Sequence, residues 1–361
     1  MNRPMRVVIC WSGVSGYLAA CWRALSRQTG LELIVLAEPA VQPYSLALLD
    51  GIRHTILEKN EWCDVHLMAR RVLGLSPDIV VISGWSRRGF AELPFQRGLE
   101  KVPFLLAMDT PWRNQWRQRL ASYWLQRLVK RMSGVFVAGE RGRQYALALG
   151  FPADGICEGV YGCDYDAFAV AAAARQSLSE WPRRFLYVGR YVSTKGIVTL
   201  AEAYQAYCER VPNPWPLSCY GAGELRGLLE AVKGIEVHDF MQPVDQPHMF
   251  AGHGALVMPS SYEPWGVVLA EAGAAGLPAV CSTAVCSSLD LVRHLYNGYV
   301  VPPENGEALT SGLQWIHDHV DLLPEMGKRS QIYAGAYSAQ SWALRWKWML
   351  QRAFEKPESL G

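Results

Sequence analysis

Apolar residues along this chain gather in short runs of three to five, and each run is followed by a longer segment with the spacing of a helix. Such runs are typical of buried strands in a parallel sheet that helices cover on both faces. One series of predicted strands occupies residues 7–11, 33–36, 79–83, 104–108 and 135–138. A second series occupies residues 185–188, 217–220, 235–237, 255–258 and 279–281. The restart predicts two doubly wound α/β domains rather than one.

The length of the chain agrees with two domains. It has 361 residues, of which 50% are hydrophobic, which is enough for two cores. Between the two series of strands, residues 162–182 show little periodicity and include four consecutive alanines. We interpret this stretch as a candidate linker. In folds of this class ligands bind beyond the carboxyl ends of the strands, so a cleft between two such domains is the expected site.

The most informative segment, residues 260–278, carries two glutamates eight positions apart, Glu263 and Glu271. Pro264 suits an early helical position, and Gly266 permits close approach of a ligand to the backbone. The turn predicts a helix that begins near Gly266. Its first N–H groups would form a seat for phosphate, and carboxylates accept hydrogen bonds from sugar hydroxyls. The segment therefore predicts a site for a nucleotide-linked sugar, although the bare spacing also fits two solvated glutamates on a surface helix.

This segment resembles the Glu-x7-Glu signature of the retaining glycosyltransferases of family 4, which have the two-domain GT-B fold. Other segments resemble that family in the same order along the chain: residues 160–168, 185–196, 220–225 and 257–261. The matches extend from about residue 134 to 303. The first 130 residues match only in pattern. The resemblance implies an N-terminal acceptor-side domain at residues 1–165, a donor-binding domain at 166–340, and a C-terminal helix at 341–361 that crosses back to the first domain.

The resemblance also implies roles for individual residues. Arg190 and Lys195 would hold the donor diphosphate and stabilise the charge that develops on it, and Glu271 would bind the ribose. Glu263 would hold the donor sugar and phosphates together with the amides that follow it. The remaining predicted binding positions are Gly13, Gly16, Gly189, Gly221, Trp265, Gly266 and Val267. An Arg-x4-Lys pair also fits a solvated surface, and residues 12–16 also fit an ordinary tight turn after a strand.

Family members generally transfer with retention of configuration and have no evident protein nucleophile. We therefore expect the acceptor to attack on the face that the phosphate leaves, with no cofactor and no metal ion. Asp109 stands where many relatives have a histidine near the sugar, and it also fits a local cap or turn. Residues 240–242 read Phe-Met-Gln instead of the family's Phe-x-Gly near the base, which leaves the nucleotide open, with UDP or GDP expected. Asp164 and Asp166, like His317 and His319, are not expected to bind metal, and the two histidines are expected at the surface.

Charge divides unevenly along the chain, although the net charge is only +2. Residues 1–150 hold 20 Lys and Arg against 11 Asp and Glu, or +9, and the rest hold 15 against 22, or −7. Within the basic half, residues 112–131 predict a helix in which aromatic and basic residues alternate. This helix fits peripheral contact with an anionic membrane, and it fits equally a core-facing stripe of Trp112, Trp116, Leu120 and Tyr123.

A glycan or lipid-linked acceptor would account for the basic half, as in synthesis of a cell-surface polysaccharide. Nucleic acid is a poorer explanation, because no recognition motif accompanies the charge. Nine cysteines without a Cys-x-x-Cys pair, and no apolar run of about 18 residues, predict a cytoplasmic protein, peripheral on the inner face of the membrane if it contacts lipid.

Two other functions stay open from the residues alone. One is a dinucleotide-dependent oxidoreductase, since Gly221, Gly223 and Gly227 follow a strand, although the third glycine is one place late. The other is a non-catalytic relative that binds a nucleotide sugar, or a partner subunit of a transferase.

Overall fold

The computed structural model describes residues 3–40 and 42–355. The chain divides into two compact units: unit 1 is Met1–Gly162 with Ala339–Gly361, and unit 2 is Cys163–Ser338. The sequence predicts boundaries after residues 165 and 340, and a closing helix beyond them. Each unit is described below by itself.

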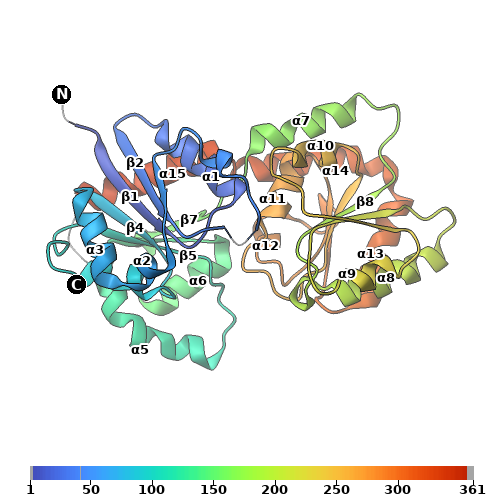
Figure 1. The fold of residues 1–361 in the computed structure, drawn as a ribbon. Coiled ribbons are helices and arrows are strands. Elements are labelled where there is room, and N and C mark those ends of the chain that lie inside the picture. Colours follow the sequence, from blue (N-terminus) through green and yellow to red (C-terminus); the bar gives the residue numbers. More distant parts are fainter. Residues whose placement is uncertain (1–2, 41, 356–361) are drawn as a thin grey trace. The chain divides into compact units, whose positions relative to one another are not determined.

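Unit 1 is built on a parallel sheet of seven strands in the order β3-β2-β1-β4-β5-β6-β7 (Figure 1). The strands are β1 (Met5–Trp11), β2 (Leu31–Ala37), β3 (His54–Ile56), β4 (Ile79–Ser83), β5 (Phe104–Met108), β6 (Gly134–Val137) and β7 (Ile156–Glu158). The register pairs Val7 with both Leu33 and Ile79, which makes β1 a central strand, buried from Val7 to Trp11.

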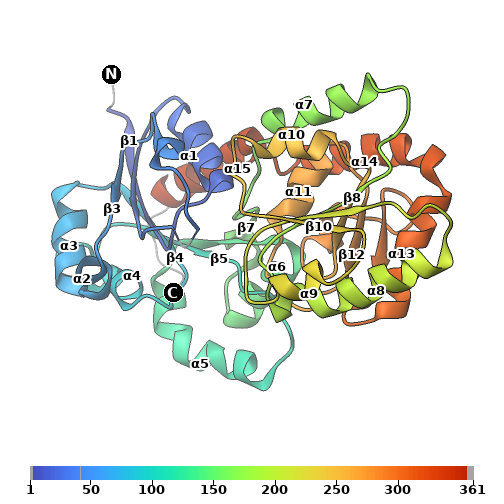
Figure 2. The same ribbon diagram turned by 45° about the vertical axis from the view of Figure 1, so that its right-hand side comes forward.

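The helices of unit 1 cover both faces of this sheet. They are α1 (Gly16–Ser26), α2 (Lys59–Cys63), α3 (Val65–Gly74), α4 (Arg88–Ala91), α5 (Trp116–Arg131), α6 (Gly139–Leu149) and α15 (Ala339–Glu355), with short 3-10 turns η1 (Leu46–Leu49), η2 (Leu93–Phe95) and η3 (Ala153–Gly155). Helices α1 and α15 lie together on one face, and α3, α5 and α6 lie on the other (Figures 1 and 2).

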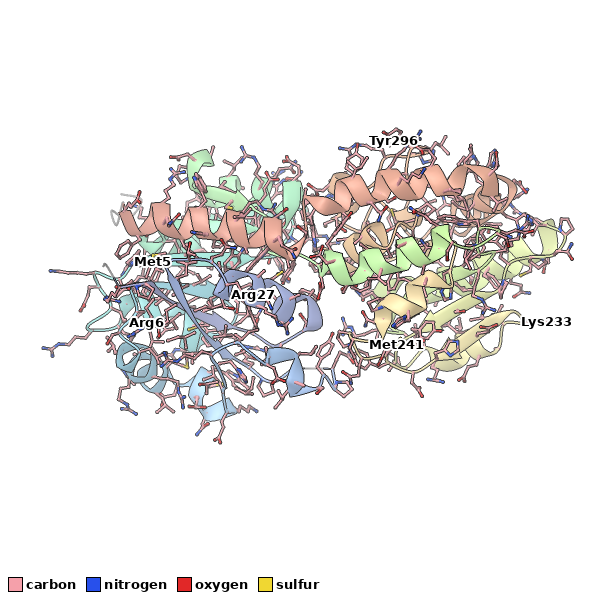
Figure 3. The ribbon with its side chains drawn as sticks, turned by 90° about the horizontal axis from the view of Figure 1, so that it is seen from above. Met5, Arg6, Arg27, Lys233, Met241 and Tyr296 are labelled. Carbon is pink, nitrogen blue, oxygen red and sulfur yellow. The ribbon has the colours of Figure 1, made fainter. Side chains whose placement is uncertain are left out.

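Unit 2 repeats the arrangement with six parallel strands in the order β10-β9-β8-β11-β12-β13. They are β8 (Phe185–Val188), β9 (Leu217–Tyr220), β10 (Ile235–His238), β11 (Ala255–Met258), β12 (Ala279–Ser282) and β13 (Gly298–Val301). In Figure 3, Lys233 marks the loop before β10 and Met241 the loop after it, at opposite ends of that strand.

The helices of unit 2 are α7 (Tyr165–Gln176), α8 (Ile197–Arg210), α9 (Arg226–Glu230), α10 (Gln246–Ala251), α11 (Val267–Ala274), α12 (Ser288–Leu291), α13 (Gly306–Asp318) and α14 (Leu323–Gly335), with 3-10 turns η4 (Ser193–Lys195) and η5 (Val320–Leu322). Helices α8 and α13 pack together on one face of the sheet, and α7, α10, α11 and α14 cover the other (Figures 1 and 2).

Both sheets have the strand order of a Rossmann-like fold. In this fold successive strands are added toward one edge and then toward the other, and the place where the order reverses is called the switch point. The switch points lie between β1 and β4 in unit 1 and between β8 and β11 in unit 2. All ten strands predicted from the apolar runs are present. The strands that the pattern missed, β3, β7 and β13, lie at sheet edges, where a short strand needs no continuous apolar run.

The predicted linker at residues 162–182 is wrong, because most of it forms helix α7 of unit 2. Asp164 caps the helix by accepting from the Ala167 N–H, and the alanine run favours helix rather than loop. Arg175 near its end is buried and donates to the carbonyls of Phe250, His253, Ala275 and Gly276, which fixes α7 to its neighbours.

Helix α15 ends the described chain and packs against α1 in unit 1. Trp342 and Trp346 are fully buried, and the Trp346 indole stacks on Phe136 with ring centres 3.9 Å apart. Trp348, in the same helix, is 55% exposed and takes no part in this packing.

Candidate functional site

An ion pair bridges the switch point of unit 2. Lys195 lies in η4, after β8, and Glu263 lies in the loop after β11, the strand beside β8. The Lys195 Nζ donates to the Glu263 Oε2, and the two side chains are only 17% and 11% exposed. The two loops are joined further by the Thr194 carbonyl, which accepts from the Ser261 and Tyr262 amides at 3.0 and 3.1 Å. A fixed cation therefore lies at the carboxyl edge of this sheet, where ligands of such folds bind.

Arg190 lies in the same loop, directly after Gly189. Its side chain is exposed and makes no hydrogen bond or ion pair with the described residues. Its carbonyl accepts from the hydroxyl of Tyr187, whose pKa is raised by burial and by nearby groups that include Glu263. The backbone of the loop is thus fixed while the guanidinium stays available to an anion.

Helix α11 begins at Val267, after a turn through Gly266 with φ +91°, as the sequence predicts. A side chain at Gly266 would meet Met258, Glu263 and Val285 within 3.0 Å, so only glycine fits. The N–H groups of Gly266, Val267 and Val268 donate to no atom of the described residues, which leaves them free for an anion. Trp265 is 2% exposed and packs on Tyr337, so its indole is part of the core.

Glu271 lies in the second turn of α11 and is buried. Its carboxylate makes no hydrogen bond to the described residues. Burial, with a smaller contribution from the nearby Asp164 carboxylate, raises the pKa of Glu271 to about 7. A buried carboxylate without a partner is expensive to hold, and such groups are enriched where a ligand supplies the missing donor.

Gly221 and Gly223, after β9, serve packing between two loops of unit 2. A Cβ at Gly221 would lie 1.9 Å from the Gly189 carbonyl oxygen, and one at Gly223 would lie 2.3 Å from that of Tyr191. Nothing lies within 4 Å of the corresponding point at Gly227. In a dinucleotide-binding turn the glycines admit a pyrophosphate and a close helix, whereas here the protein's own backbone fills the space.

At the switch point of unit 1, between β1 and β4, two serines lie where unit 2 has its ion pair. The Ser12 N–H, after β1, donates to Ser83 Oγ at the end of β4 at 2.9 Å. Gly13 follows with φ +104°, and its N–H donates to the Trp11 carbonyl in a tight turn. Gly16 is the first residue of α1, which Ser15 caps. These residues line the switch point of unit 1 without a charged side chain of their own.

Asp109 lies at the end of β5, half-buried beside Thr110. The hydroxyl of Tyr161 donates to its Oδ2 at 2.9 Å. Its other oxygen accepts no hydrogen bond from the described residues. The turn-cap explanation therefore does not account for Asp109, since its known partner is a tyrosine 52 positions away.

The helix predicted over residues 112–131 begins only at Trp116, because Trp112 turns inward and packs on Tyr145. The core-facing stripe is wrong for the other three residues: Trp116 is 64%, Leu120 40% and Tyr123 76% exposed, and Trp124 is 71% exposed. These four residues lie within an arc of about 100° on one side of the helix. The side that packs on the core carries Gln118, Leu128 and Val129 instead.

The basic residues of α5 divide into two groups. Arg131 is structural, since it donates to the carbonyls of Pro94, Leu99, Glu100 and Val102. Arg117, Arg119, Arg127 and Lys130 are exposed, and the helix contains no acidic residue. The exposed surface of α5 is thus both aromatic and cationic.

The remaining candidates have structural roles. His317 is half-buried, with its Nδ1 2.7 Å from the Tyr207 hydroxyl, and His319 stacks on Trp315, so the expected surface position is wrong for this pair. Residues 3–40 and 42–355 contain no group of three or more His, Cys, Asp or Glu side chains suited to a metal ion. None of their helices is long and apolar enough to span a membrane.

Sequence reasoning missed Tyr161, Tyr187 and Thr194, which hold site residues in place. Tyr187 and Thr194 lie inside the segment singled out by its glycine and lysine, but a buried tyrosine and a backbone carbonyl carry no motif. Tyr161 precedes the crossover between the units, and nothing near it in sequence points to Asp109.

Part of this chain is similar in sequence to a known protein family. Residues 172–332, just under half of the chain, match the model of "Glycosyl transferases group 1". An uncharacterized glycosyltransferase of Haemophilus influenzae is 26% identical over 173 residues, which are 46% of this chain and 49% of that protein. The D-rhamnosyltransferase WbpZ of Pseudomonas aeruginosa is 29% identical over 184 residues, or 47% of this chain and 46% of that protein.

The matched part thus spans about half the length of these curated relatives. The family match and the relatives together show that this part of the chain is similar to group 1 glycosyl transferases. Among solved structures, that of Anabaena Alr3699/HepE in complex with UDP has a TM-score of 0.75 at 14% identity, over 96% of this chain and 100% of that one. The chain therefore has the GT-B fold, with two Rossmann-like parallel-sheet domains.

Proposed function

We propose that this protein is a retaining, metal-independent glycosyltransferase of family 4, which moves a sugar from a UDP- or GDP-linked donor to a glycan or lipid-linked acceptor. The observation that carries the proposal is the Lys195–Glu263 pair at the switch point of unit 2. It lies within the segment that matches the group 1 family, which also contains the exposed Arg190 and the free amides of α11.

The donor fits this edge through its charge. A nucleoside diphosphate carries negative charge that grows as the glycosidic bond breaks, and fixed cations and backbone donors stabilise that state. Lys195 and Arg190 supply the cations, and the Gly266, Val267 and Val268 amides supply the donors. Glu271 accepts hydrogen bonds from the ribose hydroxyls, which gives its buried carboxylate the partners that it lacks.

In the reaction, the oxygen of an acceptor hydroxyl bonds to the anomeric carbon on the face that the diphosphate leaves. The bond between that carbon and the phosphate oxygen breaks, and the hydroxyl proton passes to the departing phosphate. The product keeps the configuration of the donor, and the other product is the nucleoside diphosphate. Asp109 accepts a hydrogen bond from a sugar hydroxyl through its free oxygen, and Gly13 and Gly16 let the substrate approach the backbone of unit 1.

The acceptor side follows from the surface of α5. Trp116, Tyr123 and Trp124 are exposed on one side of the helix, flanked by cations and no acid. Aromatic rings of this kind enter the headgroup region of a bilayer, and cations attract anionic lipids. We place this surface on an anionic membrane, where a lipid-linked acceptor is found, as in the making of a cell-surface polysaccharide. A cytoplasmic protein, peripheral on the inner face, fits this role.

The test is calorimetric titration with UDP-, GDP-, ADP- and TDP-sugars, with free nucleotides and NADPH as controls. Micromolar binding of one nucleotide series, weakened at least tenfold by Lys195→Ala, supports the proposal and names the donor. Binding of NADPH alone would overturn it in favour of the oxidoreductase, which the filled space at Gly221 and Gly223 already makes difficult.

Three further measurements examine the finer parts of the proposal. Proton NMR of the product reports the anomeric configuration, and an inverted product contradicts retention. Activity that disappears in EDTA and returns with a divalent cation contradicts metal independence. A protein that binds the donor but releases no nucleoside diphosphate with any acceptor is the non-catalytic relative or partner subunit.

A further inference from the structure

The carboxylate of Asp109 is held from one side only. Its Oδ2 accepts from the Tyr161 hydroxyl at 2.9 Å, and its Oδ1 accepts from no described residue. We propose that Tyr161 is a positioning residue, which fixes the Asp109 carboxylate so that its second oxygen faces the sugar hydroxyl. This inference rests on the function proposed above, in which Asp109 contacts the sugar.

Tyr161 is itself fixed by two aromatic neighbours in unit 1. Its ring meets Tyr17 edge-on with centres 5.4 Å apart, and meets Trp11 edge-on at 6.4 Å. Edge-to-face contacts of this kind define the angle of a ring as well as its place. Trp11 is in turn packed against Trp22 and Trp346, and all three tryptophans are buried.

The backbone that carries Tyr161 is fixed from the other side by helix α15. The indole N–H of Trp346 donates to the Gly159 carbonyl at 3.2 Å, and that of Trp342 donates to the Val160 carbonyl at 3.0 Å. The amides of Gly159 and Val160 donate to the Val137 carbonyl at the end of β6. The residue before Tyr161 is therefore bound at both its donor and its acceptor.

A carboxylate at a strand end can turn about its own bonds, and each orientation that does not face the substrate lowers the productive fraction. A hydrogen bond from a ring that cannot turn removes most of that freedom, while leaving one oxygen unused. Asp109 is half-buried, so its second oxygen stays open to a substrate while the first is held by the tyrosine. The arrangement therefore fits orientation of the carboxylate, and it predicts a loss in rate rather than in stability when the hydroxyl is removed.

The experiment measures donor hydrolysis, in which water replaces the acceptor, with the nucleotide sugar that the wild type binds. Tyr161→Phe is expected to lower kcat about tenfold, with KM for the donor and the Tm unchanged, and Asp109→Asn about a hundredfold. The double variant is expected to match Asp109→Asn alone, because without the carboxylate the tyrosine has nothing to orient. The control is Tyr296→Phe, which removes a phenol hydroxyl that bonds to no described residue.

Each result decides the inference. Parent-like kcat in Tyr161→Phe, a higher KM with kcat unchanged, or losses that multiply in the double variant would each overturn it. A fall in kcat accompanied by a fall in Tm assigns the hydroxyl to stability and overturns it as well. Failure of the proposed function is visible separately, because wild type and Tyr296→Phe would then neither bind nor hydrolyse any nucleotide sugar, and the role of Tyr161 would fall with it.

Discussion

The two units share one strand order but differ in what they carry at the switch point. In unit 2 the loops after β8 and β11 are joined by the Lys195–Glu263 ion pair. In unit 1 the Ser12 N–H in the loop after β1 donates to Ser83 Oγ at the end of β4. The charged pair of this edge lies one strand further on, where Arg87 in the loop after β4 pairs with Glu38 after β2. The scaffold therefore brings neighbouring strand ends together in both units, and the residues there decide whether an ion pair or a pair of serines bridges the switch point itself.

The difference suits the two halves of the proposed reaction. A diphosphate needs fixed cations and free amides, which unit 2 provides within a few residues of each strand end. A sugar hydroxyl needs an oriented acceptor atom, which Asp109 and Tyr161 provide in unit 1. Unit 1 also carries exposed cations and aromatic rings on the outer surface of α5. Donor binding and membrane binding should therefore be separable by mutation.

The largest expected effect comes from Lys195→Ala. The change removes a fixed cation and leaves Glu263, which is 9% exposed, without its partner. We expect nucleotide-sugar binding to fall at least tenfold and transfer to fall about 100- to 1,000-fold, since loss of one preorganised group at the leaving charge has effects of that order. Calorimetry and a nucleoside diphosphate release assay measure the two.

The matched control is Lys233→Ala, because Lys233 is exposed before β10 and pairs with no described residue (Figure 3). Binding to vesicles of anionic phospholipid, which we assign to α5 in unit 1, should stay at the wild-type level in both variants. A Lys195→Ala protein that transfers sugar as fast as wild type would remove the basis for assigning the donor to unit 2.

The next effect concerns Glu271 and pH. Burial raises its pKa to about 7 from an ordinary value of 4.5, so between these values the folded state holds the proton more tightly than the unfolded state. The free energy of unfolding should therefore fall as pH rises from about 4.5 to 7 and then level off. A shift of this size corresponds to about 3 kcal/mol at most. Glu271→Gln should lack this contribution and be the more stable protein above pH 7.

Urea unfolding at pH 5.5 and pH 8 measures the effect, with Glu202→Gln, an exposed position in α8, as the control. Glu271→Gln should also bind the donor more weakly than wild type at pH 8, where the wild-type carboxylate is ionised and accepts hydrogen bonds from the ribose. Equal pH dependence in wild type and Glu271→Gln would show that the buried carboxylate does not govern this part of the stability curve.

Most of the local geometry of the proposed donor site in unit 2 could be predicted from sequence, because each part of it is set within one short segment. The turn at Gly266, the start of α11 and the order of Gly189, Arg190 and Lys195 are each set within one short segment. Conformation there follows from backbone chemistry that the residues themselves carry. What the segments did not predict is how they are held, as with the Thr194 carbonyl that joins them.

The contacts of the proposed site residue in unit 1 could not be predicted in the same way, because they join distant segments. Tyr161 and Asp109 are 52 positions apart, and only the fold brings them together. In α5 the spacing of Trp116, Leu120 and Tyr123 shows that they share one side of a helix, but helical spacing is the same whether that side faces a core or solvent. The prediction of a linker at residues 162–182 is wrong for a related reason. Helix α7 has little amphipathic pattern, and the hydrogen bonds of buried Arg175 fix it to distant segments.

The smallest effect tests the outer surface of unit 1. Trp124 is 71% exposed in α5, so Trp124→Ser should leave the Tm unchanged and lower binding to vesicles of anionic phospholipid about fivefold, as one interfacial ring is lost. Ile332→Ser in α14, 75% exposed, removes a comparable apolar side chain from unit 2 and should have no effect. Co-sedimentation at low and high salt measures both, and the wild type should bind less at high salt because the exposed arginines contribute. Equal loss in the two variants would mean that any exposed apolar residue matters, and that α5 is not a membrane surface distinct from the donor-binding unit.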